Sequence, residues 1–344
     1  MSYSYLAYGL NLKSEAEIQG LKAIPANSDV FANEGVEIFM GDTPPWVEAA
    51  LRLPAELIYA AGSGAETEIT FRFSALGRRQ FFHFSYLDGT RFVVDGETRR
   101  IWGTCPLPFT QEDLATYLFG PVMGFVLRRR GILALHASCF SRSSRSFALC
   151  GGQGAGKSTT AAALALKGIP ILCEDIAALR EREGEFWTAP AYPRVNLWPE
   201  SAASLFGAPD ALPPISPNWE KRFLSLDGGM APFEDRERQL AAVYILEMRS
   251  DSDDAPRIEE ISAREAAVLL VQNTYMNYLL EKEQRAAEFA AIARLLSRVA
   301  VRRLIPHSDP AKIATMCELL QMDSENIAKK TAKQMDPANL GQPT

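Results

Sequence analysis

One run of residues constrains this chain more than any other. It is Gly151-Gly152-Gln153-Gly154-Ala155-Gly156-Lys157-Ser158, which fits the pattern G-x-x-x-x-G-K-[ST]. The apolar segment 146–150 before it predicts a strand, and the alanine-rich segment 159–167 after it predicts a helix. Glycines in such a loop let backbone N–H groups curl around a phosphate, and the helix N-terminus adds its positive dipole end. The run therefore predicts the phosphate-binding loop of an α/β fold.

The side chains of this loop predict how a nucleotide is held. We expect the ammonium of Lys157 to bridge the β- and γ-phosphates, and the hydroxyl of Ser158 to ligate Mg²⁺. The expected nucleotide-binding residues are Gly151, Gly152, Gln153, Gly154, Ala155, Gly156, Lys157, Ser158 and Thr159. No guanine-specific N-K-x-D motif is visible, so the expected nucleotide is ATP. The alternative interpretation is a glycine-rich turn with an exposed lysine.

Two adjacent carboxylates follow the next predicted strand, segment 169–173. They are Glu174 and Asp175, at the place where a phosphate-binding loop needs an acidic group. Mg²⁺ prefers hard oxygen ligands, and phosphoryl transfer needs a group that orients or deprotonates the attacking hydroxyl. We expect both residues to be catalytic, with Asp175 joining Ser158 as a metal ligand. The alternative is that the pair only ends a strand and caps a turn.

Two further side chains are candidates for the site. His136 ends the apolar segment 133–135, and antiparallel pairing with the next strand would bring it near the phosphates, although a lone histidine there is also commonly a core residue. Arg194 can pair with a phosphate through its planar guanidinium or can brace a loop. His307 has no visible partner and is interpreted as having no role in the site.

The rest of the chain predicts two domains. Residues 66–102 alternate apolar and polar side chains, which predicts an antiparallel meander, and residues 114–130 predict a helix that bridges the domains. Later segments predict loops over 207–236, strands at 240–248 and 301–305, and helices over 263–297 and 310–320. We expect an N-terminal α+β domain over 1–128, a catalytic domain over 129–322 and a flexible tail over 323–344.

Composition limits the partners and the compartment. The net charge is −6, so no basic surplus indicates nucleic acid or membrane lipid as a partner. The five cysteines are widely spaced in mostly apolar runs, which favours buried, reduced thiols over a zinc site. Neither a signal peptide nor an apolar stretch of about 18 residues is visible, so a cytoplasmic protein is expected.

The order of these motifs resembles the HPr kinase/phosphorylase family over roughly residues 130–305. The resemblance rests on His136-Ala137-Ser138, the glycine-rich loop, Glu174-Asp175, Tyr192-Pro193-Arg194 and Leu197-Trp198. It implies a P-loop kinase core of the HPr kinase/PEP carboxykinase type beside a smaller N-terminal α+β domain. It also implies ATP and Mg²⁺ as cofactors, a histidine near the phosphates at His136, and an acidic pair that supplies the base and a metal ligand.

The chain departs from that family at two places. Family members usually carry two aspartates where this chain has Glu174-Asp175. The glycine-rich C-terminal signature linked to HPr binding is not evident; Lys221-Arg222 and Asn273-Thr274-Tyr275 lie in the region instead. HPr is therefore disfavoured as the substrate.

The chain looks more like the stand-alone HPr-kinase-like proteins found with ribosomally made peptides, including the kinases that phosphorylate the terminal serine of lasso-peptide precursors. This similarity implies an ATP-dependent serine kinase whose partner is a peptide or small protein. The N-terminal domain would help to recognise that partner, and a homo-oligomer is an open possibility. The alternatives are a nucleotide-hydrolysing regulator and an HPr or small-molecule kinase. No cluster of extra basic residues is visible around the acidic pair, which disfavours a small anionic acid as the acceptor.

Overall fold

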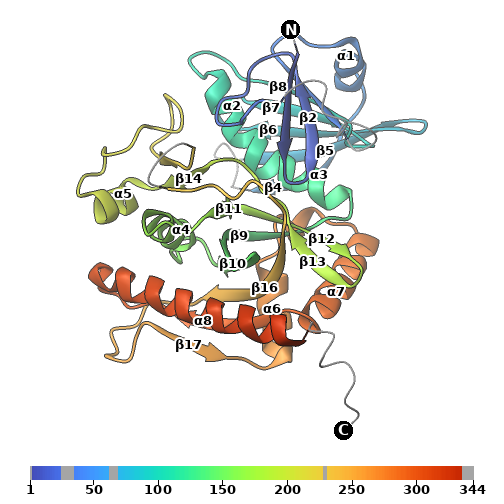
Figure 1. Cartoon of the computed structure of the whole chain (residues 1–344). Coiled ribbons are helices and arrows are strands. Elements are labelled where there is room, and N and C mark those ends of the chain that lie inside the picture. The colour runs from blue at the N-terminus through green and yellow to red at the C-terminus, as the bar shows by residue number, and fades with distance from the viewer. Residues whose placement is uncertain (1, 25–34, 62–68, 228–230, 335–344) are drawn as a thin grey trace. The chain divides into compact units, whose positions relative to one another are not determined.

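The computed structural model describes residues 2–24, 35–61, 69–227 and 231–334 (Figure 1). The chain has a mixed α/β fold with two large sheets and divides into two compact units. Unit 1 comprises Met1–Gly131, Pro214–Glu220 and Tyr278–Glu281. Unit 2 comprises Ile132–Pro213, Lys221–Asn277 and Lys282–Thr344.

Unit 1 is built on an eight-stranded sheet in the order β1-β2-β3-β8-β7-β6-β5-β4. Strands β5 to β8 form the predicted antiparallel meander, while residues 66–68 of that prediction lie outside the described residues. Strands β1 to β4 and helix α1 were not predicted. The elements are β1 (Tyr3–Ala7), β2 (Leu10–Ser14), β3 (Val36–Met40), α1 (Pro45–Leu51), β4 (Glu56–Ala61), β5 (Ile69–Leu76), β6 (Arg79–Tyr86), β7 (Arg91–Asp95) and β8 (Arg100–Thr104).

The helix predicted over residues 114–130 is broken in the structure. Helix α2 (Gln111–Tyr117) passes through a π-helical turn, η3 (Leu118–Val122), into α3 (Met123–Arg129). The break falls at Gly120, whose φ of −102° and ψ of −109° are not helical, and at Pro121, which has no N–H to donate. The prediction of one continuous helix is therefore wrong. All these segments belong to unit 1, so the prediction that the helix bridges two domains is wrong as well.

Unit 2 contains a sheet in the order β10-β9-β12-β13-β16-β18-β17, with β11 paired to β9. Because β10 also pairs with β16, strands β10, β9, β12, β13 and β16 form a closed circuit. A separate two-stranded sheet joins β14 to β15. The strands are β9 (Leu133–Arg142), β10 (Arg145–Gly151), β11 (Ile171–Cys173), β12 (Ile176–Arg182), β13 (Glu185–Thr188), β14 (Arg194–Leu197), β15 (Arg222–Ser225), β16 (Arg238–Leu246), β17 (Arg257–Glu260) and β18 (Ala300–Ile305).

Helix α4 carries the main core of unit 2. Its buried alanines and Leu164 pack with Phe140, Phe147 and Tyr244 of the sheet, and small side chains let the helix approach the strands closely. The helix predicted over 263–297 is interrupted between Gln272 and Lys282. The helices are α4 (Lys157–Leu166), α5 (Pro199–Phe206), α6 (Ala263–Gln272), η4 (Asn277–Leu279, which crosses the unit boundary), α7 (Lys282–Leu296), η5 (Pro310–Lys312) and α8 (Ile313–Gln334).

The flexible tail expected from residue 323 is wrong, because helix α8 occupies the first part of it. It continues to Gln334 and contacts α4, β9, β16 and β17 in unit 2 (Figure 1). The carboxylate of Asp323 accepts hydrogen bonds from the Tyr244 hydroxyl at 2.8 Å and from Arg302 at 2.6 Å. Further along, Ile327 and Ala328 are buried in the core. These contacts hold residues 323–334 in a helix, and residues 335–344 lie outside the described part of the chain.

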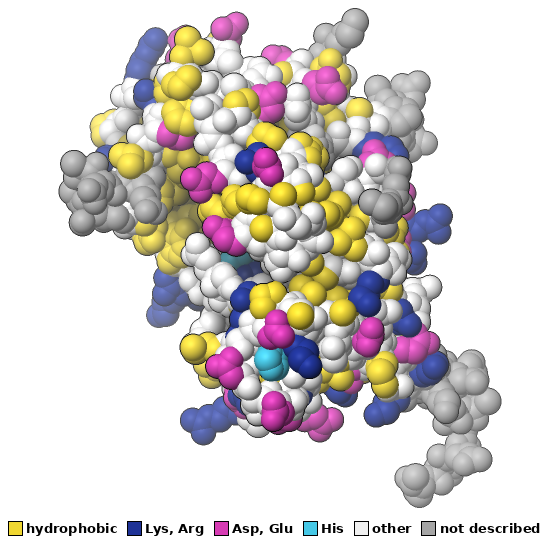
Figure 2. Space-filling model, turned by 90° about the vertical axis from the view of Figure 1, so that its left-hand side faces the viewer, with side chains coloured by type: hydrophobic (Ala, Val, Ile, Leu, Met, Phe, Trp, Pro, Cys, Tyr) yellow, Lys and Arg dark blue, Asp and Glu magenta, His cyan; other side chains and the backbone are white. Residues whose placement is uncertain are grey.

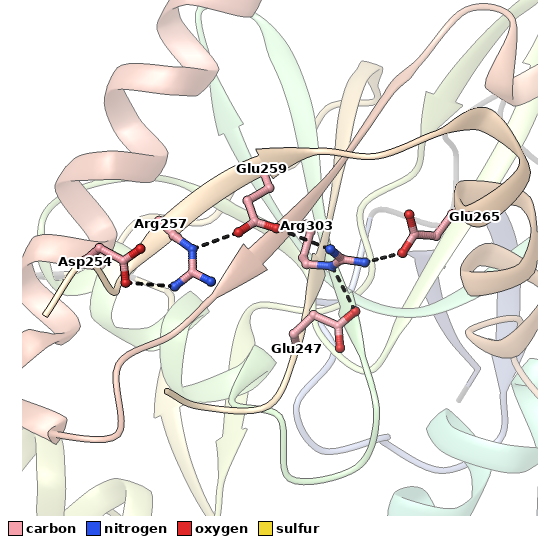
Figure 3. Close-up of polar contacts among 6 residues, drawn as sticks. All are labelled: Glu247, Asp254, Arg257, Glu259, Glu265 and Arg303. Atoms are coloured by element: carbon pink, nitrogen blue, oxygen red, sulfur yellow. Dashed lines mark hydrogen bonds and ion pairs between the residues drawn. The ribbon is translucent and has the colours of Figure 1, made fainter. Parts of the chain in front are cut away.

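A network of charged side chains anchors the edge of the unit 2 sheet. The guanidinium of Arg303 on β18 contacts Glu247 at 3.4 Å, Glu259 on β17 at 3.2 Å, and Glu265 in the first turn of α6 (Figure 3). Arg257 extends the network through Glu259 at 2.8 Å. The network ties the end of β16 and the edge strand to α6, the helix whose C-terminal end reaches the candidate site.

The surface carries both signs of charge. On the face drawn in Figure 2, acidic and basic side chains are interspersed with hydrophobic ones. Within the ranges that the structure describes, none of the helices combines the length and the apolarity that crossing a bilayer requires.

Candidate functional site

The predicted phosphate-binding loop joins β10 to α4, as the sequence pattern requires. Gly156 stands at the N-cap of α4 with φ of +104°, and Gly154 has φ of +76°, a region that favours glycine. At Gly151 a Cβ would lie 2.7 Å from the carbonyl oxygen of Leu246. At Gly152 and Gly154 a Cβ would meet no atom within 4 Å. The loop is therefore packed at its start and open around its middle.

Lys157 is buried beneath this loop, with 7% of its surface exposed. Its ammonium donates hydrogen bonds to the carbonyl oxygens of Gly151 at 2.7 Å and Gly152 at 3.1 Å. Burial lowers the pKa of this ammonium, and the negative charge of Asp175 partly offsets that effect. Among the described residues Lys157 forms no ion pair, so its charge is not neutralised by a carboxylate in contact with it.

Ser158 and Glu174 form a direct contact. The Ser158 hydroxyl donates a hydrogen bond to Oε1 of Glu174 across 2.7 Å, and Glu174 is only 4% exposed. Burial raises the pKa of the Glu174 carboxyl, as does the neighbouring charge of Asp175. Two hard oxygen donors thus lie side by side at the start of α4.

Asp175 faces different partners. Its Oδ1 lies 3.3 Å from Nε2 of His136, and its Oδ2 accepts a hydrogen bond from the Tyr275 hydroxyl at 2.9 Å. Burial would raise the pKa of this carboxyl, but the hydrogen bond and charge of His136, together with Tyr275, hold it below its usual value. Asp175 is therefore the more readily ionised member of the pair.

The backbone at Asp175 is strained. Its φ is +67°, and the N–H of Ile176 donates to the carbonyl of Glu174 across 2.8 Å, which closes a tight turn between β11 and β12. Turns of this kind are rare outside positions where the surrounding structure enforces them. Here Ala137 of β9 donates its N–H to the carbonyl of Asp175 at 3.1 Å, which fixes the turn against the sheet.

The antiparallel pairing of β9 with β10 predicted from the sequence is present. Ala137 is paired with Cys150, so His136 lies beside the start of the loop. On the other edge of β9, His136 is paired with Ile176, which follows Asp175. The loop, the histidine and the acidic pair are thus brought together by neighbouring strands.

Two site residues had no role assigned from the sequence. Asn273 follows α6; its side-chain Oδ1 accepts from the Gly151 N–H at 2.8 Å and its carbonyl accepts from the His136 N–H at 2.7 Å. Tyr275 holds Asp175 through its hydroxyl. Because these contacts join residues about a hundred positions apart, no local pattern in the sequence signals them.

Unit 2 contains two further basic side chains of interest, Lys221 and Arg194. The positive charge of Lys221 opposes the rise in the pKa of Glu174 and contributes to the lowered pKa of Asp175. Arg194 is 8% exposed, and its Nε has no hydrogen-bond partner among the described residues. Its guanidinium lies 5.3 Å from the centre of the Tyr192 ring. The sequence shows no cluster of extra basic residues around the pair, and the structure adds the charge of Lys221 to it.

A cavity of about 230 Å³ borders the loop on the α4 side. Thr159 lines it and shares a hydrogen bond of 2.9 Å with Ser201, while Met316 and Ile313 of α8 supply apolar wall. His307, to which the sequence assigned no role, lines it as well. The full lining is Ala155, Gly156, Thr159, Thr160, Glu200, Ser201, Ser204, Arg249, Pro306, His307, Asp309, Pro310, Lys312, Ile313 and Met316.

Comparisons with known proteins give little further information. No family model matches the chain, and no curated protein matches it. Among solved structures, the chain is similar to the Hpr(Ser) kinase/phosphatase from Coxiella burnetii, with 12% sequence identity and a TM-score of 0.31. That match covers 58% of this chain and 96% of the other.

Proposed function

We propose that unit 2 is an ATP-dependent kinase that transfers the γ-phosphate to a serine hydroxyl of a peptide or small protein. The observation that carries this proposal is one arrangement of charges. At the start of α4, the buried ammonium of Lys157 experiences the charges of two carboxylates, Glu174 and Asp175, that are held by separate partners. A lysine on a glycine-rich loop and two differently held carboxylates are the groups that phosphoryl transfer requires.

The residues present fit a magnesium nucleotide. Ser158 and Glu174 offer two hard oxygens 2.7 Å apart, and Mg²⁺ bound to a nucleotide needs only one or two protein ligands beside phosphate oxygens and water. When bound, Mg²⁺ would neutralise charge on the phosphates.

The contacts favour a division of labour within the acidic pair. Glu174 is the metal ligand that acts together with Ser158, whereas the sequence assigned this ligand role to Asp175. Asp175, kept ionised by its neighbours, accepts the hydrogen bond of the acceptor hydroxyl and aligns it, with His136 beside it. Lys157 exchanges its two carbonyl partners for phosphate oxygens and stabilises the charge that develops during transfer.

The cavity beside Thr159 fits the nucleoside half of ATP. It borders Gly156 and Thr159, where a nucleotide leaves the loop, and its apolar wall at Ile313 and Met316 suits a purine face. Hydroxyls at Thr159 and Ser201 offer partners for a ribose.

The acceptor proposed here follows the sequence resemblance: a ribosomally made precursor peptide of the lasso type, recognised with the help of unit 1. A second candidate acceptor is a small anionic molecule. Lys221 near the acidic pair and the buried Nε of Arg194 favour it, because a buried guanidinium without a carboxylate partner suits an anion.

Substitution of the loop lysine tests the proposal. We expect Lys157→Ala to reduce phosphotransfer about 10²- to 10⁴-fold and to leave the circular dichroism spectrum unchanged. Lys167→Ala is the matched control, because Lys167 lies at the far end of α4 and pairs with Glu318 across 3.6 Å.

The assay uses radiolabelled ATP, Mg²⁺ and the peptides encoded beside the gene, followed by mass spectrometry. A phosphoserine product that depends on Lys157 supports the kinase. ADP release without a phosphorylated peptide supports the nucleotide-hydrolysing alternative, and retained transfer by Lys157→Ala would refute the assignment of this lysine.

A further inference from the structure

A second cavity lies wholly in unit 1 and is walled by aromatic side chains. Its volume is about 670 Å³, and it is lined by Ile69, Tyr86, Leu87, Asp88, Tyr117, Pro121, Trp219 and Tyr278. Trp219 and Tyr278 come from the two later segments of unit 1, 214–220 and 278–281. The described residues of the lining therefore combine four aromatic rings with one carboxylate, and they include neither lysine nor arginine.

The aromatic rings that line this cavity are inclined to one another. The centres of the Tyr117 and Trp219 rings are 5.4 Å apart with their planes at 74°, and Tyr86 packs on Tyr117 with ring centres 4.0 Å apart. Tyr278 is 43% exposed, so its ring stands at the rim. The face of an aromatic ring is electron-rich and attracts a cation that lies over it.

Asp88 places a negative charge among these rings. Its Oδ2 accepts a hydrogen bond from the Tyr117 hydroxyl at 2.8 Å, and its Oδ1 accepts from the Thr90 N–H at 2.8 Å. In the part of the chain that the structure describes, Asp88 has no basic partner. A carboxylate has about four lone-pair sites, so these two bonds fix its position and leave acceptor capacity for a ligand.

The tyrosines add polar atoms without adding charge. Burial raises the pKa of Tyr86 well above its ordinary value, and the nearby Asp88 acts in the same direction, so this phenol stays neutral. The hydroxyl of Tyr86 is buried, and no hydrogen-bond partner for it occurs among the described residues. It is a further acceptor for an N–H group that enters the cavity.

We propose that this aromatic cavity binds the guanidinium of an arginine side chain in a peptide. A guanidinium is planar, stacks on aromatic faces and carries five N–H donors, which match Asp88 and the Tyr86 hydroxyl. Unit 1 already uses this pairing internally, with Arg100 over Trp46 at 4.8 Å and Arg129 over Phe82 at 4.9 Å. That the same peptide is the phosphate acceptor rests on the proposed function; the binding itself does not.

Calorimetric titration of the full chain tests the proposal. The ligands are a short peptide with one central arginine and the same peptide with citrulline, which keeps the shape and removes the charge. We expect the arginine peptide to bind about tenfold more tightly. Asp88→Asn removes the charge and replaces one of the two acceptor oxygens by an NH2 donor, so it abolishes this preference. The exposed Asp42→Asn keeps the preference.

Two further variants make the result decisive. Tyr278→Ala removes a ring at the exposed rim, and we expect it to weaken binding of the arginine peptide. This variant tests the cavity independently if Asp88→Asn impairs folding. Lys157→Ala leaves the preference intact, so failure of the proposed kinase activity is distinguishable from failure of this site. Equal affinity of the wild-type chain for both peptides would overturn the proposal, as would an unchanged preference in a folded Asp88→Asn chain.

Discussion

The hydroxyl of Ser158 donates a hydrogen bond to Oε1 of Glu174 across 2.7 Å, whereas the adjacent Asp175 is held by His136 and Tyr275. Two consecutive carboxylates therefore point to different neighbours. The strained turn at Asp175 makes this possible, because a residue with φ of +67° turns the chain sharply between the two side chains. Their chemical roles are separable by experiment.

The first prediction separates metal binding from catalysis. Glu174→Gln removes one charged oxygen beside Ser158, so we expect the Mg²⁺ concentration for half-maximal activity to rise roughly 10- to 100-fold. Asp175→Asn removes the group that aligns the acceptor hydroxyl, so we expect kcat to fall about 10²- to 10⁴-fold with little change in Mg²⁺ dependence. Steady-state assays at varied Mg²⁺ measure both effects. The reverse pattern would assign the metal to Asp175.

The second prediction concerns pH. The pKa of the Asp175 carboxyl is lowered, so its ionised form is present above that pKa and is lost as the pH falls through it. Tyr275→Phe removes a hydrogen bond to the ionised form, which raises this pKa. The acid limb of the kcat/KM profile therefore moves to higher pH.

A pH–rate profile of each variant checks this shift. Tyr3→Phe in β1 is the control, and its profile should overlay that of the wild-type chain. A Tyr275→Phe profile with lower activity but an unmoved acid limb would show that Tyr275 does not act through Asp175.

Local patterns in the sequence predicted the central part of the site. The strand, glycine-rich loop and helix around Lys157 follow one another in the predicted order, and the acidic pair follows a strand. Such features depend on residues close together in the chain. The antiparallel pairing that brings His136 to the loop was also predictable, because β9 and β10 are joined by a short turn.

The support of the site was not predictable in this way. Asn273 and Tyr275 act on Gly151 and Asp175 across about a hundred residues, through a segment that follows α6. Lys221 lies in the segment 207–236, which the sequence predicts as loops, and its charge influences the pKa of the acidic pair. Long-range packing decides these contacts, and neither propensity nor local spacing carries information about it.

The third prediction concerns stability and the corrected tail. The segment from residue 323 is mostly polar, so its composition does not indicate that α8 has a buried face. On that face Leu320 and Ile327 pack in the core. Asp323→Ala leaves the Tyr244 hydroxyl and Arg302 without this acceptor, so we expect unfolding to become easier by about 2–3 kcal/mol.

Urea denaturation monitored by circular dichroism measures this loss. Glu318→Ala, on an exposed part of the same helix, should change stability by less than about 0.5 kcal/mol. If Asp323→Ala also changed stability by less than about 0.5 kcal/mol, the last turns of α8 would add nothing to the fold.

The last prediction separates the nucleoside cavity from the phosphate-binding loop. Ile313 lines the cavity beside Thr159, so an aspartate there places an unpaired charge against the purine face. We expect Ile313→Asp to raise the Kd for ATP roughly 10- to 100-fold. Inorganic tripolyphosphate, which has no base, should bind with little change, because the glycines and Lys157 are untouched. Met322→Asp, on an exposed position of α8, controls for the added charge. Fluorescence competition with both ligands makes the comparison direct: if ATP and tripolyphosphate weaken together, the variant acts on the loop, and if neither weakens, the nucleoside binds elsewhere.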